Sequence, residues 1–196
     1  MDLKRLWRTF RLWTSKDRSE YIRRSHIFAS FGKNSTMSSR KIPLYPELIS
    51  IGDNVRLAAN VCLVPHDMIH AMLNNTPQNP TGGGTVYREY MGCIRIDDNV
   101  FVGANSTILA DVHIGSNVII GACTLVTKDL ESGFVYAGVP AKKICAFDEF
   151  VEKRKTLVNY PDAYSRKGDS VEVDLAKWLW NDFNSKRTRK EIGKLL

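Results

Sequence analysis

Aliphatic residues recur at every sixth position along two stretches of this chain, with small or polar residues between them. A period of six matches neither the 3.6-residue repeat of a helix nor the uninterrupted alternation of a strand. It predicts short strands joined by regular corners and wound into a parallel all-β solenoid, in which each turn stacks on the next. The recurring positions are Ile51, Leu57 and Leu63 and then, after a break, Ile96, Val102, Ile108, Ile114, Ile120 and Val126.

The other positions of these hexads predict the corners. Asn often stands three positions after the aliphatic residue, and Gly often stands one position after it. Because Gly and Asn tolerate left-handed backbone, we expect both to adopt it where the chain turns. Three hexads make one triangular coil, so the nine hexads predict three coils stacked at roughly 4.8 Å, after an irregular leading coil over residues 33–50.

Helical and loop segments flank and interrupt the repeat. Residues 2–14 predict a basic amphipathic helix. A turn-rich excursion over residues 68–92 separates the two stretches of hexads, and a loop of that length inside a strict repeat is usually functional or flexible. After the repeat we expect a short helix over residues 148–158, capped by Asp148, and a last helix over residues 171–183 followed by a basic tail.

The chain divides by charge as well as by pattern. Lys and Arg outnumber Asp and Glu by eleven to three in residues 1–41 and by thirteen to nine in residues 142–196, whereas residues 42–141 hold four against nine. A dedicated nucleic-acid-binding protein would place its basic charge on the folded face, so we expect no nucleic-acid partner. We predict three parts: a basic helical segment over 1–32, a β-helix domain over 33–144 that contains the 68–92 excursion, and a helical extension over 145–196.

Composition indicates the compartment. The sequence contains no run of 18 apolar residues, so it predicts no transmembrane helix, and its first residues do not have the pattern of a secretory signal. Four cysteines lack a CxxC pairing, and we expect them to be reduced, at core or corner positions of a cytosolic protein. The helix over residues 1–14 leaves two alternatives: it covers the open end of the solenoid, or it lies on an anionic membrane. The cysteines are Cys62, Cys93, Cys123 and Cys145.

Two short segments after the last hexads, VTKD at 126–129 and YAGVPAK at 136–142, are more specific than the repeat. With the hexads they closely resemble the left-handed β-helix acyltransferases over roughly residues 30–158. The match is nearest to sugar and polysaccharide O-acetyltransferases of the maltose/galactoside and capsule-biosynthesis type. This resemblance implies a left-handed parallel β-helix, acetyl-CoA as co-substrate, and a homotrimer with sites between neighbouring subunits. The hexads alone are less specific, since nucleotidyltransferases and γ-class carbonic anhydrases share the fold.

His66 ends the third hexad, where the chain leaves the repeat for the excursion. A sugar hydroxyl is a weak nucleophile, and an imidazole with a pKa of about 6.5 can take its proton at neutral pH. By the resemblance, His66 matches the family's catalytic histidine, with the hydroxyl attacking the thioester directly in a ternary complex. We expect Asp67 and His70 to contact the acceptor, with orientation of His66 as the alternative for Asp67. His113, in a regular hexad, is expected to be structural.

The resemblance also implies a strip of residues that bind the cofactor. Small residues at two corners would let the pantetheine arm approach the backbone, and lysines would meet the CoA 3′-phosphate as point charges. Phe101 either stacks against the cofactor or packs at the lip of the site. The implied residues are Ala104 and Ala122 for the pantetheine arm, Thr127 and Lys128 for the nucleotide end, and Lys142 with Lys143 for the 3′-phosphate.

The sequence therefore predicts an O-acetyltransferase that acts on a sugar, sugar-nucleotide or lipid-linked glycan in surface-polysaccharide biosynthesis, with no resident metal. We expect it in the cytoplasm, with peripheral contact to the inner membrane face as a variant. One alternative is an amino-sugar N-acetyltransferase, which would share the cofactor strip. Another is a metal-dependent hydratase of the γ-carbonic-anhydrase type, which needs three converging histidines, for which His66, His70 and His113 are the candidates.

Overall fold

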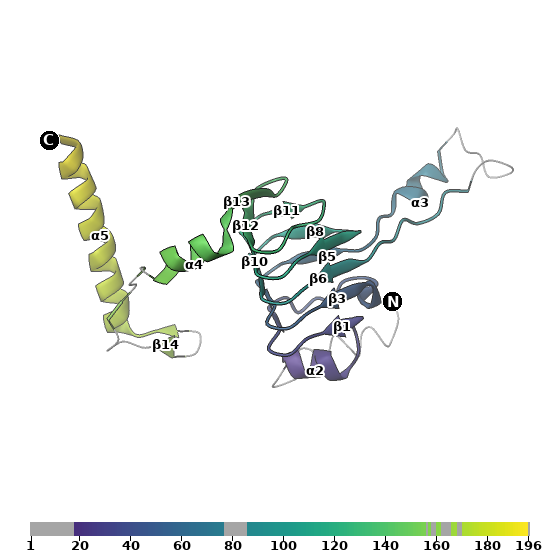
Figure 1. Cartoon of the computed structure of the whole chain (residues 1–196), viewed down its shortest axis with the longest axis horizontal. Helices are drawn as coiled ribbons and strands as arrows, with labels where there is room; N and C mark the ends of the chain where they lie inside the picture. Colours follow the sequence, from purple (N-terminus) through teal and green to yellow (C-terminus); the bar gives the residue numbers. More distant parts are fainter. Residues whose placement is uncertain are drawn as a thin grey trace. The chain divides into compact units, whose positions relative to one another are not determined.

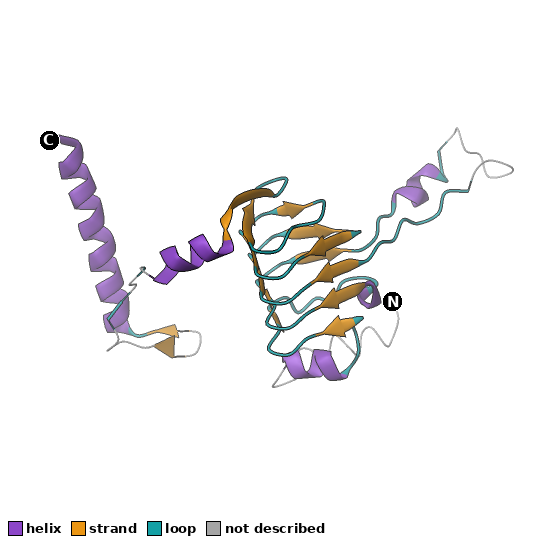
Figure 2. Cartoon of the chain, in the orientation of Figure 1, coloured by secondary structure: helices purple, strands orange, loops and turns teal. Residues whose placement is uncertain are grey.

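The computed structural model describes residues 18–76, 86–155, 157, 160–161, 166–167 and 170–195. Three parallel sheets run through residues 30–146, and their strands follow one another in rotation along the chain. Each full circuit visits all three sheets and then moves to the next level, which Figures 1 and 2 show as a stack of coils. The parallel-sheet architecture predicted from the period of six is therefore confirmed.

The three sheets differ in the number of their strands, and this difference matters for the site. In sheet C, β5 (Cys62–Val64) is the outermost strand of the described residues on the N-terminal side, whereas sheets A and B continue by one more strand. Sheet A contains β1 (Ser30–Phe31), β3 (Ile49–Ile51), β6 (Ile94–Ile96) and β9 (Val112–Ile114). Sheet B contains β2 (Thr36–Met37), β4 (Arg56–Leu57), β7 (Val100–Val102), β10 (Val118–Ile120), β12 (Phe134–Ala137) and the antiparallel β13 (Lys142–Ala146). Sheet C contains β5 (Cys62–Val64), β8 (Thr107–Leu109) and β11 (Leu125–Val126).

The aliphatic residues of all nine hexads are buried in the interior of the coils. The register explains why, because Val102 of β7 lies beside Ile120 of β10, one circuit of eighteen residues later. Fully burying such a side chain stabilises the folded state by about 1.5–3 kcal/mol. A single coil would leave this interior open above and below, so the coils are stable only as a stack.

The corners confirm one part of the sequence expectation and correct another. The third residue after the aliphatic position has positive φ in eight coil corners, and it is Asn in six of them. Side-chain amides of stacked corners also bond to one another, as Asn54 Nδ2 does to Asn99 Oδ1 (2.9 Å) and Asn99 Nδ2 to Asn117 Oδ1 (3.2 Å). The corner glycines do not have positive φ. They are required instead for close approach, since a Cβ on Gly103 would lie 2.4 Å from the backbone nitrogen of Ala122.

A short helix covers the N-terminal end of the stack. Helix α2 (Arg18–Arg24) contacts β1 and β2 and buries Ile22 against them. The helix expected over residues 2–14 lies outside the described residues. The leading coil that follows α2 has twenty residues rather than eighteen, because Phe31 pairs with Ile51. Its extra length lies between β2 and β3, in a segment that ends in the 3-10 turn η1 (Pro46–Leu48).

The predicted excursion leaves the stack between β5 and β6. Its described parts, residues 67–76 and 86–93, include helix α3 (Ile69–Leu73) and project away from the coils in Figure 1. Both parts are tied together at their base, where Asp67 N–H donates to the carbonyl oxygen of Tyr90 (3.0 Å). Large apolar side chains are exposed along it: Met68, Ile69, Met72, Val86, Tyr87, Tyr90 and Met91.

The C-terminal elements correct two predicted boundaries. Helix α4 (Phe147–Lys155) begins one residue before Asp148, which therefore lies in the first turn and does not cap the helix. Val151–Leu196 form a separate compact unit, which begins within α4 and contains the antiparallel strands β14 (Arg166–Lys167) and β15 (Ser170–Val171) and the helix α5 (Val173–Leu195). Helix α5 thus continues through the basic tail instead of ending at Phe183. Among the described residues, no helix is long and apolar enough to span a membrane.

Candidate active site

His66 lies at the corner where the chain leaves sheet C. It follows β5 after the buried Pro65, and it forms an isolated antiparallel bridge with Met91 at the end of the excursion. Gly92 N–H donates to the carbonyl oxygen of Pro65 (2.8 Å) in the same place. The excursion therefore begins and ends beside His66, so its two ends are held next to this imidazole.

Tyr45 holds the imidazole of His66 from one side. The two rings meet edge-on, with centroids 5.0 Å apart and planes 77° apart. The Tyr45 hydroxyl donates to Glu89 Oε2 (3.1 Å) on the returning part of the excursion, and this hydrogen bond raises the pKa of the Tyr45 phenol. Nδ1 of His66 is buried and has no hydrogen-bond partner among the described residues. Aromatic packing against Tyr45 thus helps to orient the ring.

The two predicted acceptor contacts lie on the first part of the excursion. Asp67 Oδ1 accepts a hydrogen bond from the Ile69 N–H (3.0 Å), which fixes the start of α3. Within the described residues its carboxylate is not bonded to His66. His70 lies on α3, and its Nδ1 is also buried, with no hydrogen-bond partner in the part of the chain that the structure describes. Contact of either residue with an acceptor stays a prediction.

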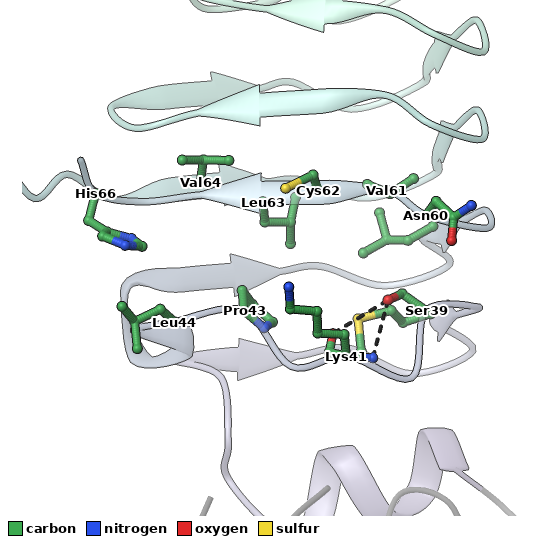
Figure 3. Close-up of a pocket in the computed structure, with 12 residues that line it drawn as sticks. Ser39, Lys41, Pro43, Leu44, Asn60, Val61, Cys62, Leu63, Val64 and His66 are labelled. Carbon is green, nitrogen blue, oxygen red and sulfur yellow. Dashed lines mark hydrogen bonds between the residues drawn. The ribbon is translucent and has the colours of Figure 1, made fainter. Parts of the chain in front are cut away.

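A cavity of about 430 Å³ opens beneath β5 and reaches His66. Figure 3 shows it as a gap between β5 and the irregular segment 39–44, with His66 at one end and Asn60 at the other. His66 and Lys41 point into this gap from opposite sides. The lining residues are Met37, Ser39, Lys41, Pro43, Leu44, Leu57, Asn60, Val61, Cys62, Leu63, Val64 and His66.

The predicted cofactor strip follows the corner between sheets B and C. Ala104 and Ala122 stand at the same place on successive coils, where Cys123 N–H donates to the carbonyl oxygen of Ala104 (2.8 Å). Ala122 is exposed and Ala104 is half-buried, so the corner presents backbone and methyl groups to solvent. Thr127 and Lys128, just after β11, are exposed as well.

The two lysines predicted for the 3′-phosphate differ in their surroundings. Lys143 Nζ forms an ion pair with Glu131 (2.8 Å) and lies 3.5 Å from the ring centroid of Phe134. This ion pair lowers the pKa of Glu131. Lys142, on the preceding position of β13, is exposed. Lys142 is therefore the better placed of the two to meet an added anion. Phe101, on β7, is 45% exposed, which is compatible with either predicted role.

His66 and the strip lie at different corners of the same chain. His66 follows a strand of sheet C, whereas Ala104 and Ala122 precede strands of sheet C. A parallel strand rises about 3.3 Å per residue, so the length of the strands of sheet C separates the imidazole from the strip within one chain.

His113 is engaged with a neighbouring carboxylate. Its Nε2 lies 2.8 Å from Asp97 Oδ2, and Arg95 Nε donates to Asp97 Oδ1 (2.9 Å). Burial raises the pKa of Asp97, but the hydrogen bonds from His113 and Arg95 outweigh it and leave that pKa below its ordinary value. In the described part of the chain, no three His, Cys, Asp or Glu side chains form a group that could hold a metal ion. All four cysteines are free, and none of them lies in the core.

Sequence reasoning missed Tyr45, Glu89 and Lys41. All three lie in segments without hexad periodicity, where the only sequence signals are single aromatic or charged residues. Pro43 offers one indirect signal, since it stands six residues after the buried Met37, where a strand residue would be expected.

Comparison with known proteins confirms the resemblance. Residues 94–128 match the family model described as bacterial transferase hexapeptide (six repeats). The chain is 28% identical to Bacillus subtilis YvoF, provisionally named an acetyltransferase, over 69% of this chain and 70% of that protein. It is 37% identical to Escherichia coli galactoside O-acetyltransferase over 49% of this chain and 43% of that protein. It is 41% identical to Staphylococcus aureus 2,3,4,5-tetrahydropyridine-2,6-dicarboxylate N-acetyltransferase over 32% of this chain and 26% of that protein. The last two matches span less than half of those proteins.

Solved structures share the fold. A maltose O-acetyltransferase from Clostridium difficile is 27% identical, with a TM-score of 0.53 over 72% of this chain and 85% of that chain. A hexapeptide-repeat-containing acetyltransferase from Vibrio cholerae, complexed with acetyl coenzyme A, gives a TM-score of 0.56 at 17% identity, over 74% and 85%. The chain thus has the coil architecture of hexapeptide-repeat acetyltransferases.

Proposed function

We propose that this chain, which carries the hexapeptide repeat of bacterial transferases, moves the acetyl group of acetyl-CoA to a hydroxyl of a sugar-containing acceptor. The observation that carries the proposal is the position of His66, whose ring lines a cavity at the base of the excursion. Supporting it, two of the similar proteins are named for O-acetyl transfer to a galactoside or to maltose, and another was solved with acetyl coenzyme A.

The chemistry requires one base and two aligned reactants. His66 takes the proton of the acceptor hydroxyl while that oxygen attacks the thioester carbonyl carbon. The carbon–sulfur bond then breaks, the acetyl group leaves on the acceptor oxygen, and the proton held on the imidazole passes to the CoA sulfur. Holding both reactants in one ternary complex makes an acyl-enzyme unnecessary, because proximity replaces a second covalent step.

The described residues suit acetyl-CoA as the co-substrate. The exposed Ala122 and half-buried Ala104 leave the corner backbone within reach of an extended pantetheine arm. Thr127 and Lys128 would lie towards the nucleotide, and the exposed Lys142 offers a cation for the 3′-phosphate.

We also propose a homotrimer with its sites between neighbouring copies. His66 and the strip stand at opposite ends of sheet C within one chain, so a copy that brings its strip against His66 of the next would complete the site. Closed three-fold symmetry would form three such sites from one kind of interface.

Several features of the proposal follow from the resemblance to the family. The coil is left-handed, and residues 33–144 form the catalytic domain between the segments 1–32 and 145–196. The protein acts in the cytoplasm, in surface-polysaccharide biosynthesis. Residues 1–14 cover the open end of the solenoid, and a peripheral contact with the inner membrane face is the alternative. Flotation with anionic liposomes at low salt decides between them, because the absence of binding would end the membrane alternative.

An amino-sugar N-acetyltransferase is the second candidate, because an N-acetyltransferase from Staphylococcus aureus is among the relatives. A panel of paired acceptors, each sugar offered with a hydroxyl or an amino group at the same carbon, separates the two functions. Thiol release only with the amino members would replace the O-acetyltransferase proposal.

Calorimetric titration of acetyl-CoA into wild type and His66→Ala tests the main proposal. Both proteins should bind acetyl-CoA with micromolar affinity, and only wild type should release thiol with the sugar panel. His26→Asn is a matched control, since His26 is exposed and has a positive φ that Asn tolerates. Absence of acetyl-CoA binding by wild type would contradict the proposal, and full activity of His66→Ala would remove His66 as the base.

A further inference from the structure

The returning limb of the excursion, residues 86–92, is bonded to the backbone on both sides of His66. The two hydrogen bonds run from Gly92 N–H to the carbonyl oxygen of Pro65 (2.8 Å) and from Asp67 N–H to the carbonyl oxygen of Tyr90 (3.0 Å). The backbone that carries the imidazole is therefore held by the last residues of this limb, so whatever fixes the limb also fixes His66.

Side chains fasten the same limb to the coils on opposite sides of β5. Glu89 accepts a hydrogen bond from Tyr45 of the leading coil, and the next residue, Tyr90, donates its hydroxyl to Asp111 Oδ2 at the corner after β8. Successive side chains of an extended segment point in opposite directions, which explains how two neighbours reach different coils. The limb is thus clamped between the leading coil and the coil that contains β8.

Asp111 contacts two residues of the limb. Its carboxylate accepts the hydrogen bond from Tyr90 and also lies against Gly92, where an added Cβ would come within 2.2 Å of Oδ1. The hydrogen bond to Asp111 raises the pKa of the Tyr90 phenol, so the hydroxyl keeps its proton at neutral pH. A bond from a hydroxyl to a carboxylate is stronger than one between neutral groups. Both contacts hold the end of the limb against this corner.

The bond between Tyr90 and Asp111 joins the level of His66 to the level of the predicted cofactor strip. Because β5 pairs in register with β8, Asp111 takes on its coil the place that His66 takes on the coil of β5. Ala104, the first residue of the strip, lies on the same coil as Asp111, at the other end of β8. Neighbouring coils stand about 4.8 Å apart. The bond therefore helps to set the distance of the imidazole from the coil on which the strip begins.

We propose that Tyr90 and Asp111 are positioning residues, whose hydrogen bond holds the returning limb against the coil of β8 and thereby sets the position of His66 relative to the acetyl donor. This inference rests on the proposed acetyl transfer. Both residues act through His66 and not through contact with either substrate. Loss of their bond should lower kcat and leave acetyl-CoA binding unchanged, since a displacement of about 1 Å near the reacting groups costs about a hundredfold in rate.

Kinetics of matched variants test the two residues. Tyr90→Phe should lower kcat about tenfold with an unchanged KM for acetyl-CoA. Asp111→Gly should cause the same loss, and strain does not explain it, because glycine tolerates the φ of 57° at this corner. Asp111→Asn keeps an acceptor oxygen and tolerates the same φ, so it should stay within about threefold of wild type. Tyr87→Phe is the control, since Tyr87 lies on the same limb and bonds to Asn74 through its backbone.

The double variant Tyr90→Phe/Asp111→Gly tests whether the residues act as a pair. It should lose no more kcat than either single variant, because each single change already breaks their common bond. Losses that multiply would show that the two residues act separately, and they would overturn the proposal.

Amide hydrogen exchange of the full chain measures the clamp without any activity. In Tyr90→Phe and Asp111→Gly, the amides of Asp67 and Gly92 should exchange about tenfold faster, because their bonds hold the limb beside His66. The Gly103 amide, which donates to a carbonyl oxygen within the stack, should exchange at the wild-type rate. Faster exchange at all three amides would indicate general destabilisation and would contradict a local clamp.

Unchanged exchange of the Asp67 and Gly92 amides in Tyr90→Phe also overturns the proposal. So does a loss confined to the KM for the acceptor, which would make Tyr90 an acceptor contact. A wild-type chain that transfers no acetyl group would refute the proposed function instead, and amide exchange would then still decide whether Tyr90 and Asp111 hold the limb.

Discussion

The ring of Tyr45 stands edge-on against the imidazole of His66, while its hydroxyl donates to Glu89 on the excursion. One side chain thus links the candidate base to the loop that leaves and returns beside it. Tyr45 has φ 52° and ψ 51°, a left-handed conformation that is costly for an aromatic residue and is often found at functional sites.

Removing the Tyr45 ring should therefore lower activity through the position of His66. Tyr45→Ala is expected to reduce kcat about tenfold to a hundredfold with little change in the KM for acetyl-CoA, because small misplacements of a catalytic group are costly. Tyr45→Phe keeps the ring contact and should stay within about threefold of wild type. Steady-state kinetics with both variants checks this, and equal losses would assign the effect to the Glu89 hydrogen bond.

Mixed trimers test whether His66 and the strip act from different copies. His66→Ala and Ala122→Trp should each be inactive alone, the second because a large side chain blocks the exposed corner. Random co-assembly should restore about a quarter of wild-type activity, since sites shared between copies can combine two intact halves. Activity that stays at the level of the separate variants would show that both halves belong to one chain.

Lys142 should matter more than Lys143 for the cofactor. Lys143 is already paired with Glu131 and packed over Phe134, whereas Lys142 is exposed. We expect Lys142→Ala to weaken acetyl-CoA binding about fivefold, in keeping with about 1 kcal/mol for an exposed ion pair. Dephospho-CoA, which lacks the 3′-phosphate, is the control and should bind both proteins equally. A larger loss in Lys143→Ala would reverse the assignment.

Gly103→Ala should destabilise the stack. The added Cβ would meet the backbone nitrogen of Ala122 at 2.4 Å, and overpacking of this kind costs about 1–3 kcal/mol. At roughly 2–4 °C per kcal/mol, Tm should fall by several degrees. Gly121→Ala is the matched control, because its nearest neighbour is the Ala137 methyl group at 3.0 Å. Thermal unfolding monitored by circular dichroism measures the Tm of both variants. Equal Tm values would refute the close-approach argument.

Asp97 should contribute to stability in a defined pH window. Its folded pKa is below the ordinary value of about 3.9, because hydrogen bonds from His113 and Arg95 outweigh burial. Such a carboxyl stabilises the fold above its unfolded pKa, and the contribution is lost as pH falls through the folded pKa. The Tm difference between wild type and Asp97→Asn should be full above about pH 5 and shrink below pH 4. A constant difference from pH 7 to pH 3 would contradict this.

The hexads predicted the core because each buries one aliphatic residue in six. This spacing can be read from the sequence without any knowledge of contacts. The leading coil was harder to predict from the sequence. Phe31 and Met37 occupy the same buried positions, but the two extra residues before Ile51 break the count of six. The extent of α5 was also underestimated, since pairs such as Lys186 with Asp182 support a helix that the apolar pattern alone does not reveal.

The candidate site was predictable only in part. His66 stood out in the sequence because it ends a hexad, whereas the cofactor strip was implied by the resemblance to the family, and both roles stay predictions. Tyr45 and Lys41 could not be located, because their proximity to His66 depends on the path of an irregular segment and not on any period. Corner glycines were assigned the wrong reason, since the coils require their lack of a Cβ and not their tolerance of positive φ.

The constant register of the coils has a consequence for how this architecture can change. Val100 pairs with Val118 one circuit later, so an insertion that lengthens the stack itself, unlike one that leaves the coil at a corner as the excursion does, must add a whole circuit of eighteen residues. Each such insertion between β5 and β13 would move Lys142 away from His66 by one strand spacing, about 4.8 Å. The distance from His66 to Lys142 can therefore change only in steps of one strand spacing. A donor of a different length would be accommodated by gaining or losing entire coils, while single substitutions could only adjust the fit within one step.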